Sequence, residues 1–171
     1  MSASILVTFS SVYGSTQEVA GEMAAVLRQA GLQVDLQPAR RVSGLAGYRA
    51  VVLGAPLYML HWHKDALRFL SRHRQALAGL PVAVFALGPF HNTEEELHSA
   101  GEQLDKELAK YAWFKPVAVE VFTGKYDPAT LRFPYNLIGP LKKIPASDER
   151  DWDAIRTWTR ELVARFSVVE S

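Results

Sequence analysis

The chain has 171 residues, 49% of them hydrophobic, with 19 basic and 18 acidic residues and a formal net charge of +1. This length is typical of one compact domain with a sizeable core rather than of two domains. The balanced charge provides no general attraction to nucleic acid, so we expect no nucleic-acid partner. Because the chain has no cysteine, disulfides, thiol catalysis and cysteine-ligated metal centres are excluded.

The start of the sequence gives no indication of export. Residues 1–4 lead directly into an apolar run, without the basic segment and long apolar segment of a secretory signal. No uncharged apolar run approaches the length that spans a membrane. We therefore expect a cytoplasmic protein.

Strand and helix patterns alternate along the chain. In order, they predict a strand at 5–7, a helix at about 16–30, an edge strand at 32–36, a strand at 50–55, a helix over 66–77, a strand at 82–87, a helix at about 93–111, a strand at 117–122 and a last helix at 152–166. Strands that are apolar throughout and alternate with helices are typical of a parallel sheet covered on both faces. We predict a single α/β domain over 1–171, a doubly wound fold with a five-stranded parallel sheet and helices on both faces. An insertion at about 123–150 precedes the last helix.

Three loops leave the carboxyl ends of the predicted strands, at 10–16, 56–63 and 88–91. Open α/β sheets bind their ligands in the crevice beyond these ends. The loops are therefore the first place to look for a functional site.

The first loop is rich in hydroxyls and runs from a strand into a helix N-terminus. Backbone N–H groups and the positive end of the helix dipole meet at such a turn, and together they attract a phosphate. Ser15 followed by Glu18 is also the pattern of an ordinary capping box, so a purely structural turn remains an alternative. The sequence has neither Gly-x-x-x-x-Gly-Lys-Ser/Thr nor Gly-x-Gly-x-x-Gly, and a single terminal phosphate therefore fits better than a triphosphate or a dinucleotide.

The second and third loops contribute aromatic side chains, Tyr58, Trp62 and Phe90. Aromatic rings beside a phosphate site suit a planar ring system, and the combination describes flavin mononucleotide (FMN). The alternative is that Tyr58 or Trp62 simply caps the sheet as a core residue. His61 and His63 have no cluster of further ligands around them, so we expect no metal, and either histidine is a candidate for proton transfer at the flavin edge.

At this point the sequence resembles the flavodoxin family, through the turn ending Gly14-Ser15-Thr16, the aromatic second loop and Gly88-Pro89-Phe90. The string His61-Trp62-His63, the helix ending Phe69-Leu70 and Arg72-His73, and an insertion after the fifth strand resemble its menaquinone-dependent protoporphyrinogen dehydrogenase branch more closely.

The resemblance implies an FMN site in which the first loop holds the phosphate and the other two loops flank the isoalloxazine ring. The residues it assigns to FMN are Ser10, Ser11, Val12, Tyr13, Gly14, Ser15 and Thr16 for the phosphate, and Pro56, Leu57, Tyr58, Met59, Leu60, His61, Gly88, Pro89, Phe90 and His91 for the ring.

The sequence departs from typical flavodoxins in two places. Tyr13 stands where they often have threonine, so one phosphate contact is expected to come from the backbone alone. No glycine occurs between Gly54 and Gly79, although flavodoxins usually place one in the loop at flavin N5. A non-glycine residue there costs about 1–3 kcal/mol in the strained conformation, so we expect weak stabilisation of the one-electron reduced flavin and favour two-electron chemistry.

The insertion combines basic and aromatic residues. Segment 123–145 has a local net charge of +3, from four basic residues and one acidic residue, interleaved with Tyr126, Phe133 and Tyr135. Such a segment suits a carboxylate-bearing aromatic substrate such as a porphyrin, or peripheral contact with an anionic membrane surface, where quinones dissolve. A surface insertion packed on its own apolar residues is the alternative.

The leading hypothesis is therefore an FMN-dependent oxidoreductase that moves electrons between an organic substrate and a quinone, with protoporphyrinogen oxidation as its most specific form. Two alternatives remain: a flavodoxin-type electron carrier without its own substrate, and a flavin-free interaction module of the same fold.

Overall fold

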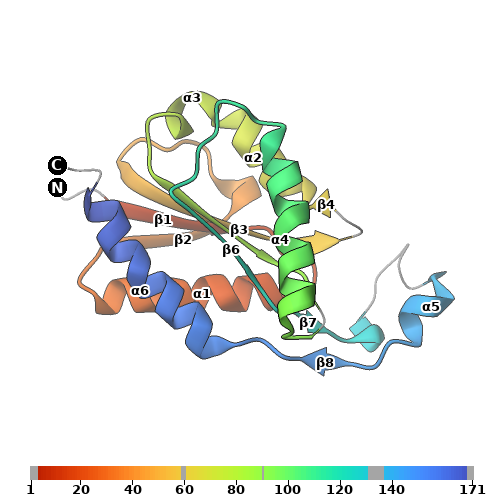
Figure 1. Cartoon of the computed structure of the whole chain (residues 1–171). Helices are drawn as coiled ribbons and strands as arrows, with labels where there is room; N and C mark the ends of the chain where they lie inside the picture. Colours follow the sequence, from red (N-terminus) through yellow and green to blue (C-terminus); the bar gives the residue numbers. More distant parts are fainter. Residues whose placement is uncertain (1–3, 59–60, 90, 131–136, 169–171) are drawn as a thin grey trace.

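The computed structural model describes residues 4–58, 61–89, 91–130 and 137–168. Its centre is a parallel sheet in the order β2-β1-β3-β5-β6 (Figure 1). The five strands are β1 (Ser4–Phe9), β2 (Val34–Pro38), β3 (Tyr48–Tyr58), β5 (Val82–Leu87) and β6 (Ala118–Phe122). The predicted five-stranded parallel sheet is confirmed, with β2 at an edge as its alternating pattern indicated.

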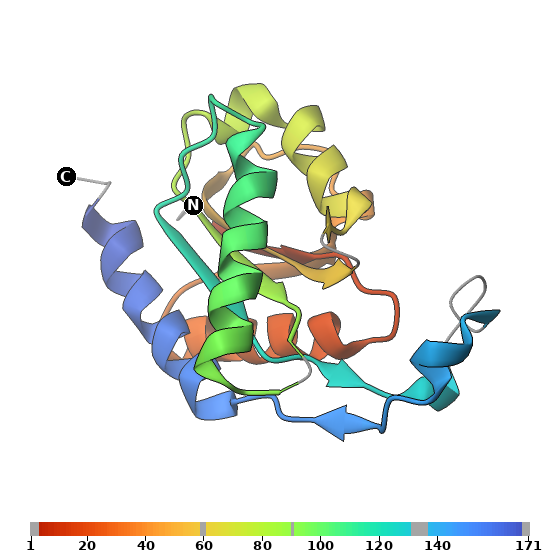
Figure 2. The same ribbon diagram turned by 45° about the vertical axis from the view of Figure 1, so that its right-hand side comes forward.

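Helices cover both faces of the sheet. Figures 1 and 2 show α1 (Ser15–Gln29) and α6 (Trp152–Val168) side by side on one face, and α2 (Lys64–Arg72), α3 (Arg74–Leu77) and α4 (Glu94–Ala109) on the other. The 3-10 turn η1 (Ala39–Arg41) follows β2.

Two hydrophobic clusters separate the sheet from these two layers. In β1, Ile5, Val7 and Phe9 belong to the cluster under α1 and α6, whereas Leu6 belongs to the cluster under α2 and α4. Successive side chains of a strand point to opposite faces, so both sets must be apolar. This is why the central strands are continuous apolar runs.

β3 is longer than predicted. The sequence indicates an end near Ala55 followed by a loop, but the strand continues to Tyr58 and then pairs in antiparallel fashion with β4 (His61–Trp62). Pro56 is tolerated because the pairing with β1 ends at Gly54, so no β1 carbonyl needs the N–H that proline lacks. The second loop is therefore the end of a hairpin.

Two smaller boundaries also differ from the predictions. The helix predicted over 66–77 is interrupted at His73, which ends α2 and begins α3 with φ −107° and ψ 20°. The edge strand begins at Val34, two residues later than its alternating pattern predicts.

The insertion extends away from the sheet at the carboxyl edge of the strands (Figures 1 and 2). Its described elements are β7 (Lys125–Tyr126), η2 (Pro128–Thr130), α5 (Gly139–Lys142) and β8 (Ser147–Asp148). β7 and β8 form an antiparallel pair, and the Tyr126 hydroxyl donates a hydrogen bond to the carbonyl of Leu141. In the described ranges, no helix has both the length and the apolar character required to cross a membrane.

Candidate functional site

The three predicted loops meet at the carboxyl edge of the sheet. The Tyr13 and Tyr58 rings are in edge contact with their centroids 6.4 Å apart, which joins the first loop to the second. The third loop is joined to the segment after β6, because Gly88 N–H donates to the Phe122 carbonyl at 3.2 Å and Gly124 N–H donates to the Pro89 carbonyl at 3.0 Å. The described parts of all three loops therefore lie at the same edge of the sheet, whereas Met59, Leu60 and Phe90 lie outside the described residues.

The first loop is a tight turn around Gly14. This residue has φ +91°, in the left-handed region that favours glycine, and its N–H donates to Ser11 Oγ at 2.9 Å. Ser10 is buried, and its Oγ has no hydrogen-bond partner among the described residues. A buried hydroxyl without a partner is costly, so the Ser10 O–H is an unused hydrogen-bond donor at the start of the first loop.

The N-terminus of α1 is open. Gly14 is its N-cap and supplies no side-chain cap, so the capping-box interpretation of Ser15 and Glu18 is wrong. The first-turn N–H groups of a helix have no intrahelical partner, and no side chain in the described part of the chain caps α1. Thr16 is buried in this first turn. The geometry fits the phosphate interpretation of the loop.

The carboxylate of Glu18 is held by an arginine from the insertion. Arg150 Nη1 lies 3.2 Å from Glu18 Oε2, and Arg150 Nε and Nη2 each donate at 2.8 Å to Asp148. The Arg150 side chain is only 4% exposed, and its guanidinium lies 4.9 Å from the centroid of the Trp152 ring. The hydrogen bonds from Arg150 hold the pKa of Asp148 below its ordinary value despite partial burial. Arg150 therefore fastens the insertion to the first turn of α1.

The second loop separates its two aromatic residues. Trp62 is buried, and its Nε1 donates to the Ala55 carbonyl at 3.0 Å, so Trp62 is a core residue, as the alternative interpretation held. Tyr58 is half-buried and contacts Tyr13 at the crevice. Of the two, Tyr58 is the ring placed to contact a ligand.

The two candidate histidines are in different environments. His63 is the N-cap of α2, and its Nδ1 accepts a hydrogen bond from Asp65 N–H at 3.2 Å. Burial lowers the pKa of His63 and outweighs the nearby Asp65 charge. His61 Nδ1 instead lies 3.3 Å from Glu107 Oε1, while its side chain is 71% exposed. His63 thus has a structural role, and His61 is the exposed member of the pair.

The third loop is fastened to α4. His91 N–H donates to Glu96 Oε2 at 2.9 Å, and His91 Nδ1 lies 3.0 Å from Glu96 Oε1. The hydrogen bond and charge of Glu96 raise the pKa of His91. Thr93 caps the N-terminus of α4, since its Oγ1 accepts a hydrogen bond from Glu96 N–H at 3.3 Å. At Gly88 an added Cβ would lie 3.3 Å from the Leu57 Cβ, so a side chain there would crowd the second loop.

A hollow of about 680 Å³ adjoins the second and third loops. Apolar residues line it together with residues that carry hydroxyl, amide and carboxylate groups. The lining residues are Leu57, Gly88, Pro89, Thr93, Glu95, Glu96, Ser99, Ala100 and Gln103.

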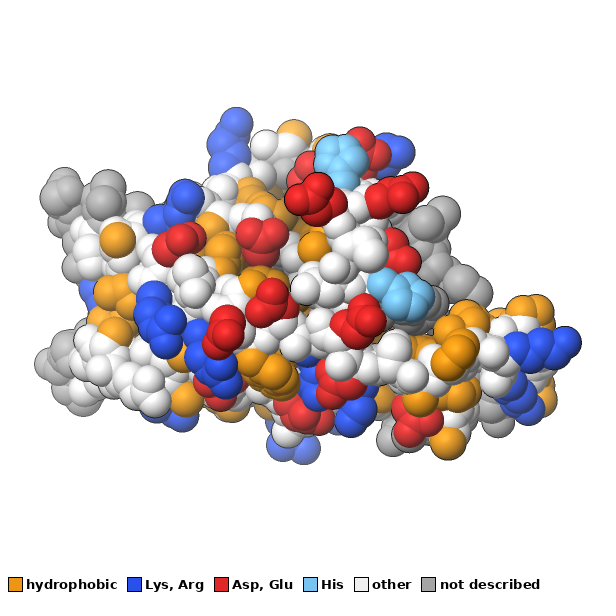
Figure 3. Space-filling model, turned by 60° about the horizontal axis from the view of Figure 1, so that its bottom comes forward, with side chains coloured by type: hydrophobic (Ala, Val, Ile, Leu, Met, Phe, Trp, Pro, Cys, Tyr) orange, Lys and Arg blue, Asp and Glu red, His pale blue; other side chains and the backbone are white. Residues whose placement is uncertain are grey.

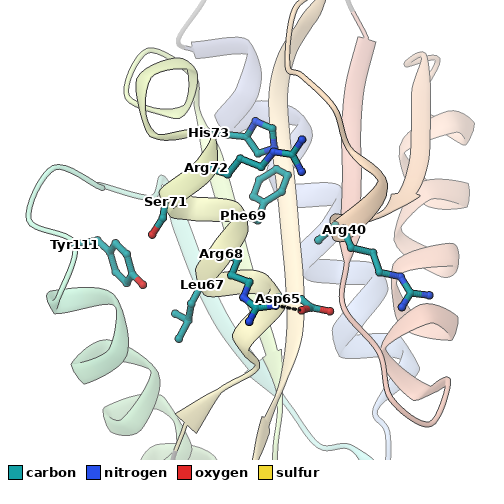
Figure 4. A pocket seen from close by; sticks show the side chains of 10 residues that line it. Arg40, Asp65, Leu67, Arg68, Phe69, Ser71, Arg72, His73 and Tyr111 are labelled. Carbon is teal, nitrogen blue, oxygen red and sulfur yellow. Dashed lines mark ion pairs between the residues drawn. The ribbon is translucent and has the colours of Figure 1, made fainter.

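A second hollow of similar volume lies over the outer face of α2, between η1 and Tyr111 (Figure 4). Arg68 and Asp65 form an ion pair of 3.9 Å within it. None of its lining residues belongs to the three loops, so it is separate from the site at the sheet edge. Among the residues described, no group of three or more His, Cys, Asp or Glu side chains is arranged to hold a metal ion.

The fold and the open N-terminus of α1 define a class of protein: a doubly wound α/β domain whose strand ends suit a mononucleotide. Residues 6–138 match the family model described as "Flavodoxin domain". The chain belongs to the flavodoxin domain family, and its cofactor is FMN. The orphaned Ser10 hydroxyl and the uncapped α1 N-terminus fit the FMN phosphate.

Relatives and solved structures agree with this family. The chain is 24% identical to the protein named protoporphyrinogen IX dehydrogenase [quinone] of Escherichia coli strain K12, over 92% of this chain and 93% of that protein. Oxidised flavodoxin 2 from Bacillus cereus aligns with a TM-score of 0.59 and 18% identity, over 95% of this chain and 99% of that one. The flavodoxin of Streptococcus pneumonia TIGR4 aligns with a TM-score of 0.58 and 19% identity, over 95% of this chain and 99% of that one.

Two residues of the site are missing from the sequence predictions. Glu107 has a detectable signal, because it interrupts the apolar face of its helix between Leu104 and Leu108. Arg150 has none, because it lies in a segment without periodicity and its partner Glu18 is 132 residues away.

Proposed function

We propose that this chain is an FMN-dependent oxidoreductase that passes an electron pair between an organic substrate and a quinone, with a porphyrinogen as its most specific substrate. The observation that carries the proposal is the hollow beside the second and third loops. An electron carrier needs only an exposed flavin edge, whereas an enzyme needs room for a substrate next to the flavin. The similarity to the E. coli relative, named as protoporphyrinogen IX dehydrogenase [quinone], also supports an enzyme rather than an electron carrier.

Within this proposal, the chain's own residues bind and orient the cofactor and the substrate. The N–H groups at the start of α1 and the Ser10 hydroxyl bind the phosphate, and Tyr13 and Tyr58 contact the ring. The apolar residues that line the hollow, among them Leu57 and Pro89, exclude water from the substrate. When bound, FMN supplies the acceptor and donor of the electron pair.

The test is anaerobic turnover of the FMN-loaded protein with protoporphyrinogen IX as donor and menadione as acceptor. Ala100→Leu fills the hollow, and we expect it to raise KM for the porphyrinogen at least tenfold while the Kd for FMN stays unchanged. His98→Leu is the matched control, because His98 is on the same helix, is exposed and does not line the hollow. Retained flavin without turnover, combined with electron transfer to a protein acceptor, would refute the enzyme in favour of a carrier.

We also propose that the insertion contacts an anionic membrane surface, where a quinone would be reached. Leu137 is 70% exposed, and Lys142 and Lys143 are exposed on the same part of the chain. Figure 3 shows hydrophobic and basic side chains together at the right-hand end of the molecule, where the insertion extends. Each lysine near such a surface contributes about 1 kcal/mol.

Sedimentation with vesicles that contain an anionic phospholipid tests this contact. We expect charge reversal of both lysines, K142E with K143E, to reduce binding at least tenfold. Lys106→Glu, on α4, should have little effect. Equal binding of all variants, or no binding of the wild type, would contradict the membrane proposal and leave the enzymatic one standing.

A further inference from the structure

Glu107 is a carboxylate inside an apolar layer. Its side chain is 4% exposed, and its helix neighbours Leu104 and Leu108 belong to the hydrophobic cluster between α4 and the sheet. Burying a charge costs several kcal/mol unless it has close partners. The buried carboxylate of Glu107 must therefore have hydrogen-bond partners that offset this cost.

Two of the polar partners of Glu107 come from the β3–β4 hairpin. Oε2 accepts a hydrogen bond from Trp62 N–H at 3.4 Å, and Oε1 lies 3.3 Å from His61 Nδ1. Lys110, one turn along the chain from Glu107, donates to Oε1 at 2.8 Å. Burial raises the pKa of Glu107, but the hydrogen bonds from Lys110 and His61 outweigh it and the net pKa is lowered. Glu107 is therefore an anion at neutral pH.

An ionised carboxylate only accepts hydrogen bonds, so His61 must donate from Nδ1. The neutral ring then carries its proton on Nδ1 and a lone pair on Nε2. His63 has the opposite arrangement, because its Nδ1 accepts from Asp65 N–H. Of the two histidines in the second loop, only His61 presents a free Nε2 with a carboxylate behind it.

His61 also lies opposite Tyr58, the half-buried aromatic residue of the second loop. It pairs with Tyr58 across the hairpin, and the Tyr58 ring contacts Tyr13 of the first loop. Its side chain is largely exposed, so the ring can be reached from solvent. A carboxylate, an imidazole and an accessible Nε2 form the arrangement that proton-transfer sites use.

We propose that Glu107 is a positioning residue that holds His61 in the Nδ1–H tautomer, so that Nε2 exchanges the proton that accompanies hydride transfer. The proton-transfer role of Nε2 rests on the proposed function. Oxidation of the substrate would break one C–H bond, whose electron pair bound FMN would accept as a hydride, and one N–H or O–H bond, whose proton His61 Nε2 would bind. A quinone that takes up this hydride would receive the same proton from Nε2 and become a quinol.

The first arm of the test measures the tautomer directly. Long-range ¹H–¹⁵N correlation spectra of ¹⁵N-histidine-labelled, FMN-loaded protein distinguish Nδ1–H from Nε2–H, and H61Q assigns the signal. We expect the Nδ1–H form in the wild type and conversion to mainly Nε2–H in Glu107→Met, which removes both acceptors. Lys110→Met is the matched control, since it removes another partner of the same oxygen and should leave the tautomer unchanged.

Glu107→Gln covers the case in which the methionine variant does not fold. It keeps the size of the side chain and removes the charge, and we expect the Nδ1–H population to fall. An Nε2–H tautomer in the wild type, or a tautomer that is unaffected by the folded Glu107 variants, would overturn the positioning role. These measurements require neither a substrate nor turnover.

The second arm measures the rate of flavin reduction by protoporphyrinogen IX in a stopped-flow instrument. We expect H61Q to slow it about 100-fold, the usual scale of general acid–base catalysis, and the double variant with Glu107→Gln to be no slower than H61Q alone. A full rate in H61Q would overturn the proton-transfer role. If the wild-type flavin is not reduced at all, the proposed function fails, whereas the tautomer measurement still decides the role of Glu107.

Discussion

Gly54 lies in β3, the central strand of the sheet, and its hydrogen atom faces an aromatic ring. A Cβ built on Gly54 would lie closer than 3.0 Å to three ring carbons of Phe85, a separation that real Cβ atoms do not adopt. Phe85 is fully buried and cannot swing away, because its ring packs against Phe122 and Trp158 at centroid distances of 6.5 and 6.4 Å. Gly54→Ala is therefore an overpacking substitution in a rigid aromatic cluster.

We expect Gly54→Ala to lower the free energy of unfolding by about 3 kcal/mol, the upper end of the usual cost of overpacking. For a chain of this length that corresponds to a fall in Tm of roughly 6–12 °C. Urea unfolding of the apoprotein measures it without the contribution of bound FMN. Gly21→Ala is the matched control: Gly21 is in α1 with no atom near its Cβ position, so the same chemical change should stabilise the helix by about 0.5–1 kcal/mol.

The double variant G54A/F85L tests the cause. A smaller side chain at position 85 makes room for the new methyl group, so the two substitutions together should be less destabilising than the sum of each alone, by about 1–2 kcal/mol. Wild-type stability in G54A, or strict additivity in the double variant, would refute the packing argument.

Three further predictions concern the site and the helices around it. Arg150→Met removes the link between the insertion and α1, and we expect a loss of about 1–2 kcal/mol in unfolding free energy and faster proteolysis near Asp148, measured by timed digestion. Burial lowers the pKa of His73 below 6.5, so on acidification the unfolded chain binds a proton before the folded chain does. The contribution of His73 to the free energy of unfolding should therefore be complete above pH 6.5 and decrease below it. His73→Gln should reduce the difference between the urea midpoints measured at pH 7.5 and pH 5.5. Ser10→Ala should weaken FMN binding about tenfold in fluorescence titrations, whereas Thr8→Val, which removes another orphaned buried hydroxyl within β1, should not.

The sheet was predictable because periodicity is a local signal. β5 falls on the predicted range 82–87, and α1 begins and ends within one residue of its prediction. Apolar runs and helical spacing indicate which residues face a core. A residue that faces the core must be apolar whichever element packs against it. The hairpin after β3 was not predictable, because Pro56 is a strand breaker in general and is accepted here only because β1 ends beside Gly54.

The loops of the site were predictable from topology alone. Parallel strands bring their carboxyl ends to one edge, so the loops after β1, β3 and β5 had to meet there. The roles within them were not, because they depend on partners that are distant in sequence or hidden by the fold. Trp62 was a candidate for either the ligand site or the core, and only its hydrogen bond to Ala55 and its full burial place it in the core.

Charged residues in the apolar layers mark where the loops are attached to the domain. Along α4 the positions Leu104, Glu107 and Leu108 follow helical spacing, so a glutamate occupies a place where the pattern requires an apolar residue. Such an interruption is destabilising unless the charge holds something, and here it holds His61 and Trp62. A sequence can therefore indicate that a buried charge has a partner, although only the fold shows that the partner is the β3–β4 hairpin. Arg150 is a buried charge that the sequence does not reveal. Its side chain is as buried as that of Glu107, but it lies in a segment without helical or strand periodicity. Nothing in the sequence therefore distinguishes it from an arginine that is exposed to solvent.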